Sequence, residues 1–275
     1  NSDVVVLCLG ISPSLEGEEM PVNIEGFDGG DRTSIELPAT QKELIREIHK
    51  LGKPIALVLL NGSALAINWE NENIPAIIEA WYPGQQGGAA IADVLFGDYN
   101  PAGRLPLTFY KSIDDIPAFT DYDMQGKTYR YFDGTPLYEF GYGLSYSTFE
   151  YSIINAPQTI KAGDTARITA EVKNTGKMDG DEVVQLYVSL PKSQSWKTPI
   201  RTLQGFKRIH LKAGESREVE FLLAPSQMAV RNASDNAEII ASGALQLSVG
   251  GKQPDKKSIA KKQVVECKIT IEGEI

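Results

Sequence analysis

The chain has 275 residues, which is enough for about two domains of ordinary size. Its hydrophobic content of 42% and charged content of 23% are typical of a globular protein, and its net charge of −9 argues against nucleic acid, whose recognition needs clustered Lys and Arg. Cys8 and Cys267 are too far apart to suggest a disulfide framework, and the isolated His49 and His210 are typical of surface or satisfied residues rather than metal ligands.

The chain opens almost at once on an apolar run at residues 4–9, which predicts a strand buried on both faces and a buried Cys8. No signal peptide is visible, and no apolar run approaches the ~20 residues of a membrane helix. Because a domain rarely begins inside a buried strand, we expect that sequence upstream has been removed.

Residues 10–38 form a loop rich in Gly, Pro and Glu, and long ordered loops in compact domains are usually functional. A helix should follow, because Thr40 and Glu43 have capping-box spacing and apolar residues recur at helical period over residues 44–51. Gly52 should end this helix, and residues 55–60 predict a second buried strand.

Residues 76–81 predict a third strand, and a Gly-rich turn then leads into a helix at residues 87–96. This alternation predicts a mainly parallel sheet with helices on both faces. Ligands of such sheets bind at the carboxyl ends of the strands, where the loop after Leu9 and the turn after Trp81 both lie. The turn lacks the Lys and spacing of a phosphate loop, which argues against a nucleotide.

The pattern changes twice along the rest of the chain. Residues 111–150 have little periodicity and many aromatics, which should pack across a domain surface, either as a strap between domains or in contact with a ligand. Alternating runs then predict short strands at residues 166–172, 183–188, 218–223, 244–249 and 264–271. They predict an antiparallel, immunoglobulin-like β-sandwich without a substantial helix. The expected domains are therefore an α/β sandwich at 1–110, a strap at 111–150 and a β-sandwich at 151–275.

Carboxylates are concentrated in the loop after the first strand, at Glu16, Glu18, Glu19 and Glu25. A glycosidase needs one carboxylic acid to protonate the leaving oxygen and a second carboxylate opposite it. Crowding of like charges raises a carboxyl pKa, as a general acid near neutral pH requires. On residue type alone, however, four surface glutamates more often form a solvated acidic patch.

Two further residue sets bear on the kind of site. Asp31 and Arg32 follow two glycines and could either anchor the loop on the sheet or contact sugar hydroxyls; Arg pairs readily with carboxylates, which favours anchoring. No Ser-His-Asp set can be assembled from two isolated histidines.

The motifs at residues 81–106, 129–132 and 140–146 resemble the C-terminal α/β domain of glycoside hydrolase family 3, in the family's order and spacing. The region after them resembles that family's fibronectin type III-like domain. The resemblance covers essentially the whole chain. It implies an α/β/α sandwich with a mainly parallel sheet, followed by a fibronectin type III-like β-sandwich.

The resemblance also implies a function. Family members are retaining, exo-acting β-glycosidases that act without a cofactor or metal, and a (β/α)8 barrel supplies the nucleophilic Asp while the α/β domain often supplies the acid/base Glu. By position Glu18 falls on the acid/base, Glu16 is the second choice, and Asp31 and Arg32 match an Asp-Arg pair that contacts substrate. Here twelve residues, 19–30, separate Glu18 from that pair.

The implied substrate is a β-linked oligosaccharide or an aryl glycoside, and the motif at residues 15–18 is more similar to that of β-xylosidases. The implied partner is the barrel of the same protein, and the implied compartment is the periplasm or the exterior rather than the cytoplasm. Thr120-Asp121-Tyr122 is similar to the nucleophile motif but follows the α/β domain, where the family has no nucleophile. With half of the carboxylate pair, this chain alone should be inactive.

Two other classes stay open. The chain could be a non-catalytic carbohydrate-binding or scaffolding module, in which the sandwich packs on a partner or a cell-wall polymer. A flavodoxin-like nucleotide binder is suggested by sheet topology alone and has no phosphate fingerprint behind it.

Overall fold

The computed structural model describes residues 2–17, 19–192, 198–231 and 237–273. These residues divide into two compact units, an α/β unit and a sandwich unit. The α/β unit comprises residues 1–99, 108–122 and 134–138, and the sandwich unit comprises residues 100–107, 123–133 and 139–275. Residues 100–138 therefore alternate between the two units: 100–107 and 123–133 belong to the sandwich unit, and 108–122 and 134–138 belong to the α/β unit. Over the described ranges, no helix is long and apolar enough to span a membrane.

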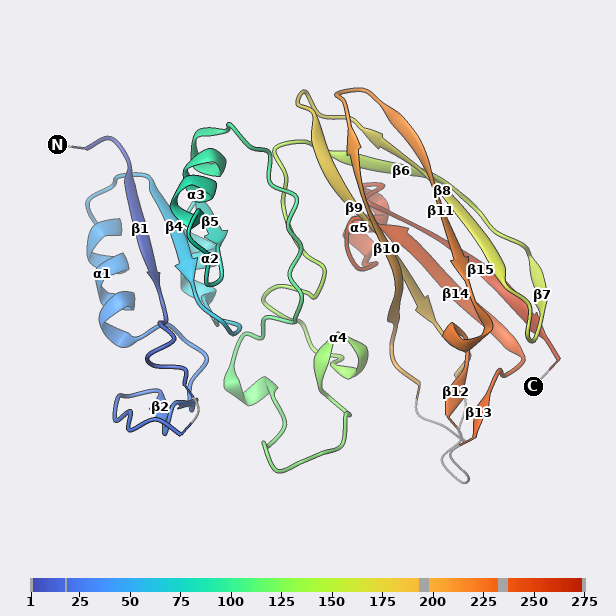
Figure 1. Ribbon diagram of the computed structural model, residues 1–275, viewed down its shortest axis with the longest axis horizontal. Helices are drawn as coiled ribbons and strands as arrows, with labels where there is room; N and C mark the ends of the chain where they lie inside the picture. Colours follow the sequence, from blue (N-terminus) through green and yellow to red (C-terminus); the bar gives the residue numbers. More distant parts are fainter. Residues whose placement is uncertain (1, 18, 193–197, 232–236, 274–275) are drawn as a thin grey trace. The chain divides into compact units, whose positions relative to one another are not determined.

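The α/β unit is built on a parallel sheet in the order β1-β4-β5, with strands Val5–Gly10, Ile55–Leu60 and Ala76–Glu79. Figure 1 shows β1 and β4 running in the same direction beside α1. Helices α1 (Ala39–His49) and α2 (Asn68–Asn73) connect these strands in chain order, and α3 (Gly87–Phe96) follows β5. A short hairpin of β2 (Phe27–Asp28) and β3 (Asp31–Arg32) lies in the loop after β1. The parallel sheet predicted for this half is confirmed.

Helix α3 has the bounds predicted from the sequence, residues 87–96. The Gly-rich turn precedes it, and Gly97 ends it in the left-handed conformation with φ +83°. The predicted capping box of α1 is wrong. That helix begins at Ala39, one residue before Thr40, and its N-cap is Pro38, which has no side-chain donor or acceptor.

Two expectations about the strands are also wrong. Among the described strands, the apolar β1 pairs with β4 alone, and its Val6 and Cys8 side chains are exposed, whereas the central β4 is buried from Ile55 to Leu59. Strand β5 ends at Glu79, two residues before Trp81, whose φ of +54° is incompatible with an extended strand.

The sandwich unit consists of two facing sheets, with strand order β10-β9-β14-β15-β7 in one and β11-β8-β6 in the other. Pairing is antiparallel except between β15 and β7. Side chains such as Tyr151, Ile168 and Leu247 form the buried core. The strands are β6 (Phe149–Asn155), β7 (Thr159–Lys161), β8 (Ala166–Asn174), β9 (Gly180–Ser189), β10 (Thr202–Leu211), β11 (Ser216–Leu223), β14 (Gly243–Gly250) and β15 (Val264–Glu272).

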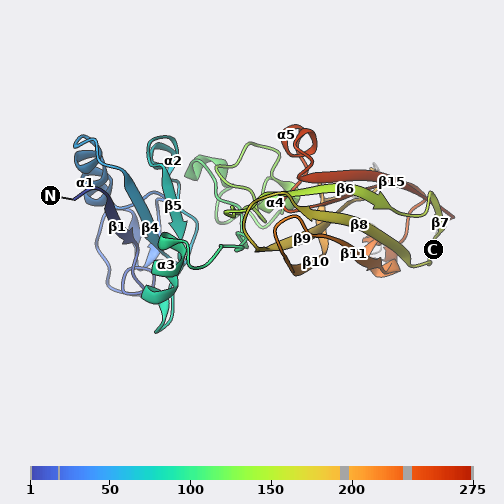
Figure 2. The ribbon, with the colours of Figure 1, turned by 90° about the horizontal axis from the view of Figure 1, so that it is seen from above.

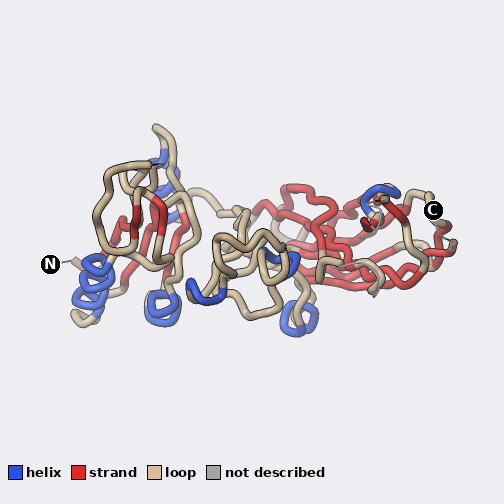
Figure 3. Tube along the Cα trace, turned by 90° about the horizontal axis from the view of Figure 1, so that it is seen from below, coloured by secondary structure: helices blue, strands red, loops and turns tan. Residues whose placement is uncertain are grey.

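The predicted β-sandwich is confirmed, and Figure 3 shows how strongly strands predominate in this unit. A small ladder of β12 (Val230–Arg231) and β13 (Glu238–Ile239) accompanies the two sheets. A five-residue helix, α5 (Lys256–Ala260), lies beside β15 in Figure 2 and was not expected from the sequence. Asp255 caps it by accepting the backbone N–H groups of Lys257 and Ser258.

Residues of the sequence motifs at 81–106 and 140–146 are held by side chains of β9. Arg104 Nη2 lies 2.9 Å from Glu182 Oε2, and both side chains are largely buried. The Glu182 carboxylate also accepts the Tyr151 hydroxyl at 3.0 Å. Gln185 donates to the Gly141 carbonyl at 3.1 Å. These contacts give the residues that carry the family resemblance a structural role in the sandwich unit.

The aromatics of the segment at residues 111–150 behave in two ways. Tyr129 stacks on Phe140 with ring centroids 4.2 Å apart, and its hydroxyl accepts the Leu203 N–H at 3.1 Å. These rings pack on the sandwich, as the frequency of aromatics predicts. Phe119 and Tyr122 are 95% and 90% exposed, so the same prediction is wrong for them. This segment also contains η1 (Ile113–Asp115) and the short helix α4 (Thr128–Tyr131).

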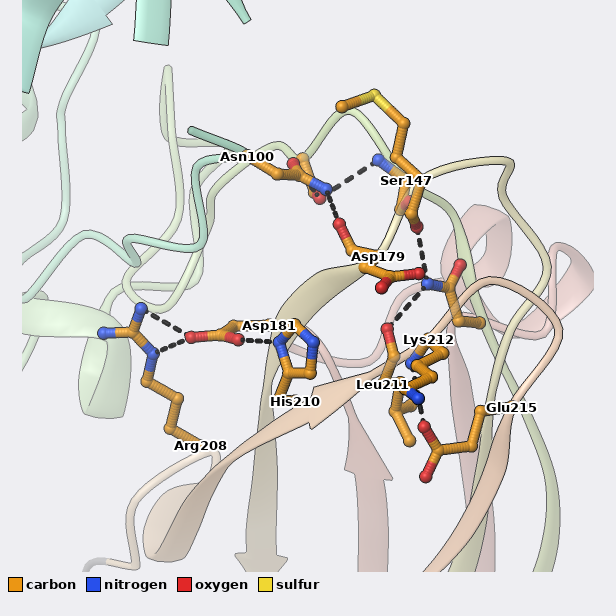
Figure 4. A network of polar contacts seen from close by, with 12 residues as sticks. Asn100, Ser147, Asp179, Asp181, Arg208, His210, Leu211, Lys212 and Glu215 are labelled. Atoms are coloured by element: carbon orange, nitrogen blue, oxygen red, sulfur yellow. Dashed lines mark hydrogen bonds and ion pairs between the residues drawn. The ribbon is translucent and has the colours of Figure 1, made fainter. Parts of the chain in front are cut away.

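Polar contacts tie the turns at one end of the sandwich, as Figure 4 shows. Asn100 Nδ2 donates to the Asp179 carbonyl at 3.0 Å. Asp181 accepts from Arg208 Nε at 2.7 Å and contacts His210 Nδ1 at 2.7 Å. These hydrogen bonds from His210 and Arg208 hold the pKa of Asp181 below its ordinary value despite partial burial, which acts in the opposite direction. His210 is thus a surface side chain with a carboxylate partner.

Candidate active-site loop

The last residue of β1, where the loop begins, is fixed by helix α1. The Gly10 N–H donates to Gln41 Oε1 at 2.9 Å, and Gln41 Nε2 donates to the Gly10 carbonyl at 2.8 Å. Gly10 has φ +137°, and a Cβ there would lie 2.0 Å from the Leu60 carbonyl oxygen. Only glycine fits this close approach of two strands, so the point where the loop leaves the sheet is defined by the backbone itself.

Glu16 is the first carboxylate of the loop, and its oxygens are occupied by donors from the α/β unit. It accepts the Ser63 hydroxyl and, at 2.6 Å, the Tyr82 hydroxyl. Arg32 Nη1 lies 3.8 Å from Glu16 Oε1. Burial and the adjacent Glu16 carboxylate raise the pKa of Tyr82, which keeps its hydroxyl protonated as a donor. The donors follow β4 and β5 in the chain, at the sheet edge where the sequence predicts a site.

Arg32 anchors the loop to the residues after β4. It donates to the Ser34 and Glu36 carbonyls, each at 3.0 Å, and to the Ser63 hydroxyl at 2.9 Å. Burial lowers the pKa of the guanidinium from its ordinary value, and the neighbouring Glu16 opposes this shift. These hydrogen bonds to the loop and to Ser63 are the contacts expected of an anchoring residue. Asp31 is exposed on the short strand β3.

Glu18, the first choice for the acid/base residue, lies outside the described residues, but the residues on both sides of it make defined contacts. Before it, a Cβ on Gly30 would lie 1.7 Å from the Gly17 carbonyl oxygen, and Gly30 has φ +96°. After it, the Met20 N–H donates to the Gly29 carbonyl at 2.8 Å. The insertion before the Asp-Arg pair therefore folds back, and its glycine turn contacts Gly17 and Met20.

Glu79 is a carboxylate that the sequence analysis did not single out. It ends β5, where Oε1 accepts the Trp81 N–H at 3.1 Å and Oε2 accepts Asn61 Nδ2 at 3.3 Å. Burial raises the pKa of this carboxyl to about 7, although both hydrogen bonds act in the opposite direction. Its place at the carboxyl end of a strand was the available signal, but its burial is set by tertiary packing.

The cluster offers carboxylates and a guanidinium rather than a metal site. Within the described ranges of the chain, no group of three or more His, Cys, Asp or Glu side chains could hold a metal ion. A carboxylate on a well-anchored loop at the end of a parallel sheet suits proton transfer to or from a bound molecule.

Comparison with known proteins identifies the class and then the family. The profile of the glycosyl hydrolase family 3 C-terminal domain matches residues 1–146, and that of a fibronectin type III-like domain matches residues 182–253. The chain belongs to glycoside hydrolase family 3 and matches the C-terminal part of its β-glucosidases and β-xylosidases.

Relatives share much of this sequence but are longer. A xylan 1,4-β-xylosidase of Xylanibacter ruminicola is 46% identical over 92% of this chain and 29% of its own length. A periplasmic β-glucosidase of Salmonella typhimurium is 40% identical over 80% of this chain and 29% of its own length. The chain thus spans about a third of the curated relatives that it matches.

Solved structures give the same result. The β-glucosidase EmGH1 from Erythrobacter marinus has a TM-score of 0.83 and 36% identity, covering 98% of this chain and 34% of that one. The family 3 β-glucosidase of Bifidobacterium adolescentis has a TM-score of 0.83 and 32% identity, covering 99% of this chain and 40% of that one.

Proposed function

We propose that this chain is the C-terminal portion of a retaining, exo-acting β-glycosidase, of the β-xylosidase or β-glucosidase type, and that Glu18 is its acid/base residue. Glu18 protonates the glycosidic oxygen in the first step and deprotonates water in the second. The observation that carries the proposal is the anchored loop: the Gln41 side chain holds Gly10 where the loop begins, the Gly17 carbonyl lies against Gly30, and the Met20 N–H donates to the Gly29 carbonyl.

The contacts of Glu16 favour Glu18 over the second choice. Both Glu16 oxygens accept hydrogen bonds from hydroxyl groups, and Arg32 lies beside them. A carboxylate so occupied suits an anchor, whereas a general acid must release its proton to the substrate and recover it. We therefore assign loop anchoring to Glu16 and Arg32, and proton transfer to Glu18.

The nucleophile belongs to another part of the protein in this proposal. Retaining hydrolysis needs two carboxyl groups about 5 Å apart. The relatives are about three times as long as this chain, and a (β/α)8 barrel in the additional sequence supplies the nucleophilic Asp. The substrate is a β-linked oligosaccharide or an aryl β-glycoside, and the 275-residue chain alone does not hydrolyse it.

The test uses the full-length protein with Glu18→Gln and Glu16→Gln variants, and Glu25→Gln as a control in the same loop, where Glu25 is exposed. Loss of the acid/base residue should lower kcat/KM by orders of magnitude for poor leaving groups and much less for activated aryl glycosides. Azide, which attacks the anomeric carbon of the glycosyl-enzyme without needing a general base, should restore turnover of the activated substrates.

Three results of this experiment can be distinguished. The described signature with azide rescue in Glu18→Gln, together with a smaller loss or none in Glu16→Gln, supports the assignment. The same signature in Glu16→Gln alone transfers the role to Glu16. Wild-type kinetics in both variants contradict a loop-borne acid, and calorimetric titration of the chain with xylo- and gluco-oligosaccharides then tests a non-catalytic binding module.

A further inference from the structure

Glu79 is connected to the loop after β1 by a series of hydrogen bonds. Its carboxylate bridges two groups, the Trp81 N–H at 3.1 Å and the Asn61 side-chain amide at 3.3 Å. Asn61 is fully buried and also donates to the Ser63 carbonyl at 2.8 Å. Ser63 is the residue whose hydroxyl bonds Glu16. One side of the Glu79 carboxylate is therefore linked to the Glu16 site through Asn61 and Ser63.

The other side of the carboxylate holds a strained turn. Trp81 has φ +54°, a left-handed conformation that costs a non-glycine residue roughly 1 kcal/mol or more. Such a conformation persists only where surrounding contacts fix it. Here the Trp81 N–H is bound by Glu79, and the indole makes an edge contact with Phe109, with centroids 6.1 Å apart.

This turn sets the direction of the next residue, Tyr82, towards the loop. The Tyr82 hydroxyl donates to Glu16 at 2.6 Å. Its ring lies over Gly62, where a Cβ would lie 2.8 Å from the ring edge, so only glycine admits the ring there. Because Tyr82 is 39% exposed, it is held in this place by the backbone of the turn and by its hydrogen bond rather than by deep burial.

We propose that Glu79 is a positioning residue for proton transfer: it fixes the turn at Trp81, which directs Tyr82 at Glu16 and thereby holds the loop that carries Glu18. This inference rests on the proposed function and deepens it. Nothing in this role requires Glu79 to touch the substrate. The carboxylate acts through two hydrogen bonds, Trp81 N–H to Glu79 and Tyr82 hydroxyl to Glu16, both made by residues of the α/β unit.

The primary variants are Tyr82→Phe and Glu79→Gln in the full-length protein. Tyr82→Phe deletes the bond to Glu16 and leaves the ring in place. Glu79→Gln keeps an acceptor for the Trp81 N–H but sets an amide N–H against that of Asn61. Glu72→Gln, an exposed glutamate on α2, is the control.

Kinetics with paired substrates separate positioning from general damage. Because small misplacements of a catalytic group cost up to about a hundredfold, kcat/KM for poor leaving groups should fall roughly tenfold to a hundredfold in each variant. The kcat/KM for activated aryl glycosides should stay near the wild-type value, and Glu72→Gln should match the wild type. A merely structural loss of folded enzyme would lower kcat for both substrates equally and leave each KM unchanged.

A double-mutant cycle tests the route. If Glu79 acts through Tyr82, the double variant should be no worse than the poorer single variant, and multiplied losses would contradict the proposal. Tyr82→Phe with wild-type kinetics would overturn it even if Glu79→Gln failed to fold. The proposed function fails separately, when Glu18→Gln and Glu16→Gln both keep full activity. If one of them shows the leaving-group signature while the Tyr82 and Glu79 variants do not, only the positioning role is lost.

Discussion

Breaking the buried ion pair between Arg104 and Glu182 should destabilise the sandwich unit far more than breaking an exposed one. Arg104 and Glu182 side chains are 11% and 2% exposed, and 2.9 Å separates the paired atoms. Arg104→Met fills similar space but leaves the Glu182 carboxylate buried without its counter-charge, a loss of about 3–5 kcal/mol. Arg167→Met is the matched control, because its pair with Glu220 is at the surface and should contribute at most about 1 kcal/mol.

The same prediction has a pH dependence with a defined sign. Burial raises the pKa of Glu182, and Arg104 is the main influence that opposes this shift. Removing Arg104 raises the pKa further, so the folded variant takes up a proton more readily than the unfolded chain does. Its stability should therefore recover as the pH falls from 8 towards 5.

Urea unfolding of the 275-residue chain, followed by far-ultraviolet circular dichroism at pH 5, 6.5 and 8, measures both effects. The free energy of unfolding of Arg104→Met should fall furthest below that of the wild type at pH 8. Equal losses in the two arginine variants, or an Arg104→Met loss that is independent of pH, would refute the argument from burial.

Two further predictions concern the α/β unit. Because burial raises the pKa of Glu79 from 4.5 to about 7, its contribution to stability should fall as the pH rises through that window, by up to about 3 kcal/mol, and Glu79→Gln should remove this part of the slope in urea unfolding. Gly10→Ala should cost about 3 kcal/mol or more, since its Cβ would lie 2.0 Å from the Leu60 carbonyl oxygen. Gly29→Ala, with φ +60° and open space around it, should cost about 1 kcal/mol. Thermal unfolding compares the two variants, and equal melting temperatures would contradict the importance of the Gly10–Leu60 contact.

Elements with strong local signals were predicted well. Helix α3 combines a Gly-rich turn, an apolar run and a terminal glycine, and β4 is an apolar run buried in the middle of the sheet. Strand β10 was missed because most of its side chains are partly or fully exposed, so no alternation marks it. Strand β1 was misjudged for the opposite reason: its composition is apolar, but it lies at a sheet edge.

The sequence predicts only part of the candidate site. A cluster of glutamates in one loop marks a candidate position, but it does not distinguish an anchored carboxylate from an available one. That distinction depends on Ser63 and Tyr82, which lie 47 and 66 residues from Glu16 in the sequence. Glu79 had only its place at the end of a strand as a local signal, because its raised pKa is a consequence of burial.

The contacts of Glu16 give a physical reason for two glutamates so close together in the loop. A catalytic group must be held within about half an ångström of its productive position by neighbours whose own geometry is fixed. A single carboxylate cannot both bond two hydroxyl groups and exchange a proton with substrate without losing one role. Two carboxylates can separate these roles, with Glu16 held by Tyr82 and Arg32 and Glu18 carrying the proton transfer that we propose. On this argument, exchanging the residues at positions 16 and 17 should impair the enzyme even though the number of glutamates is unchanged.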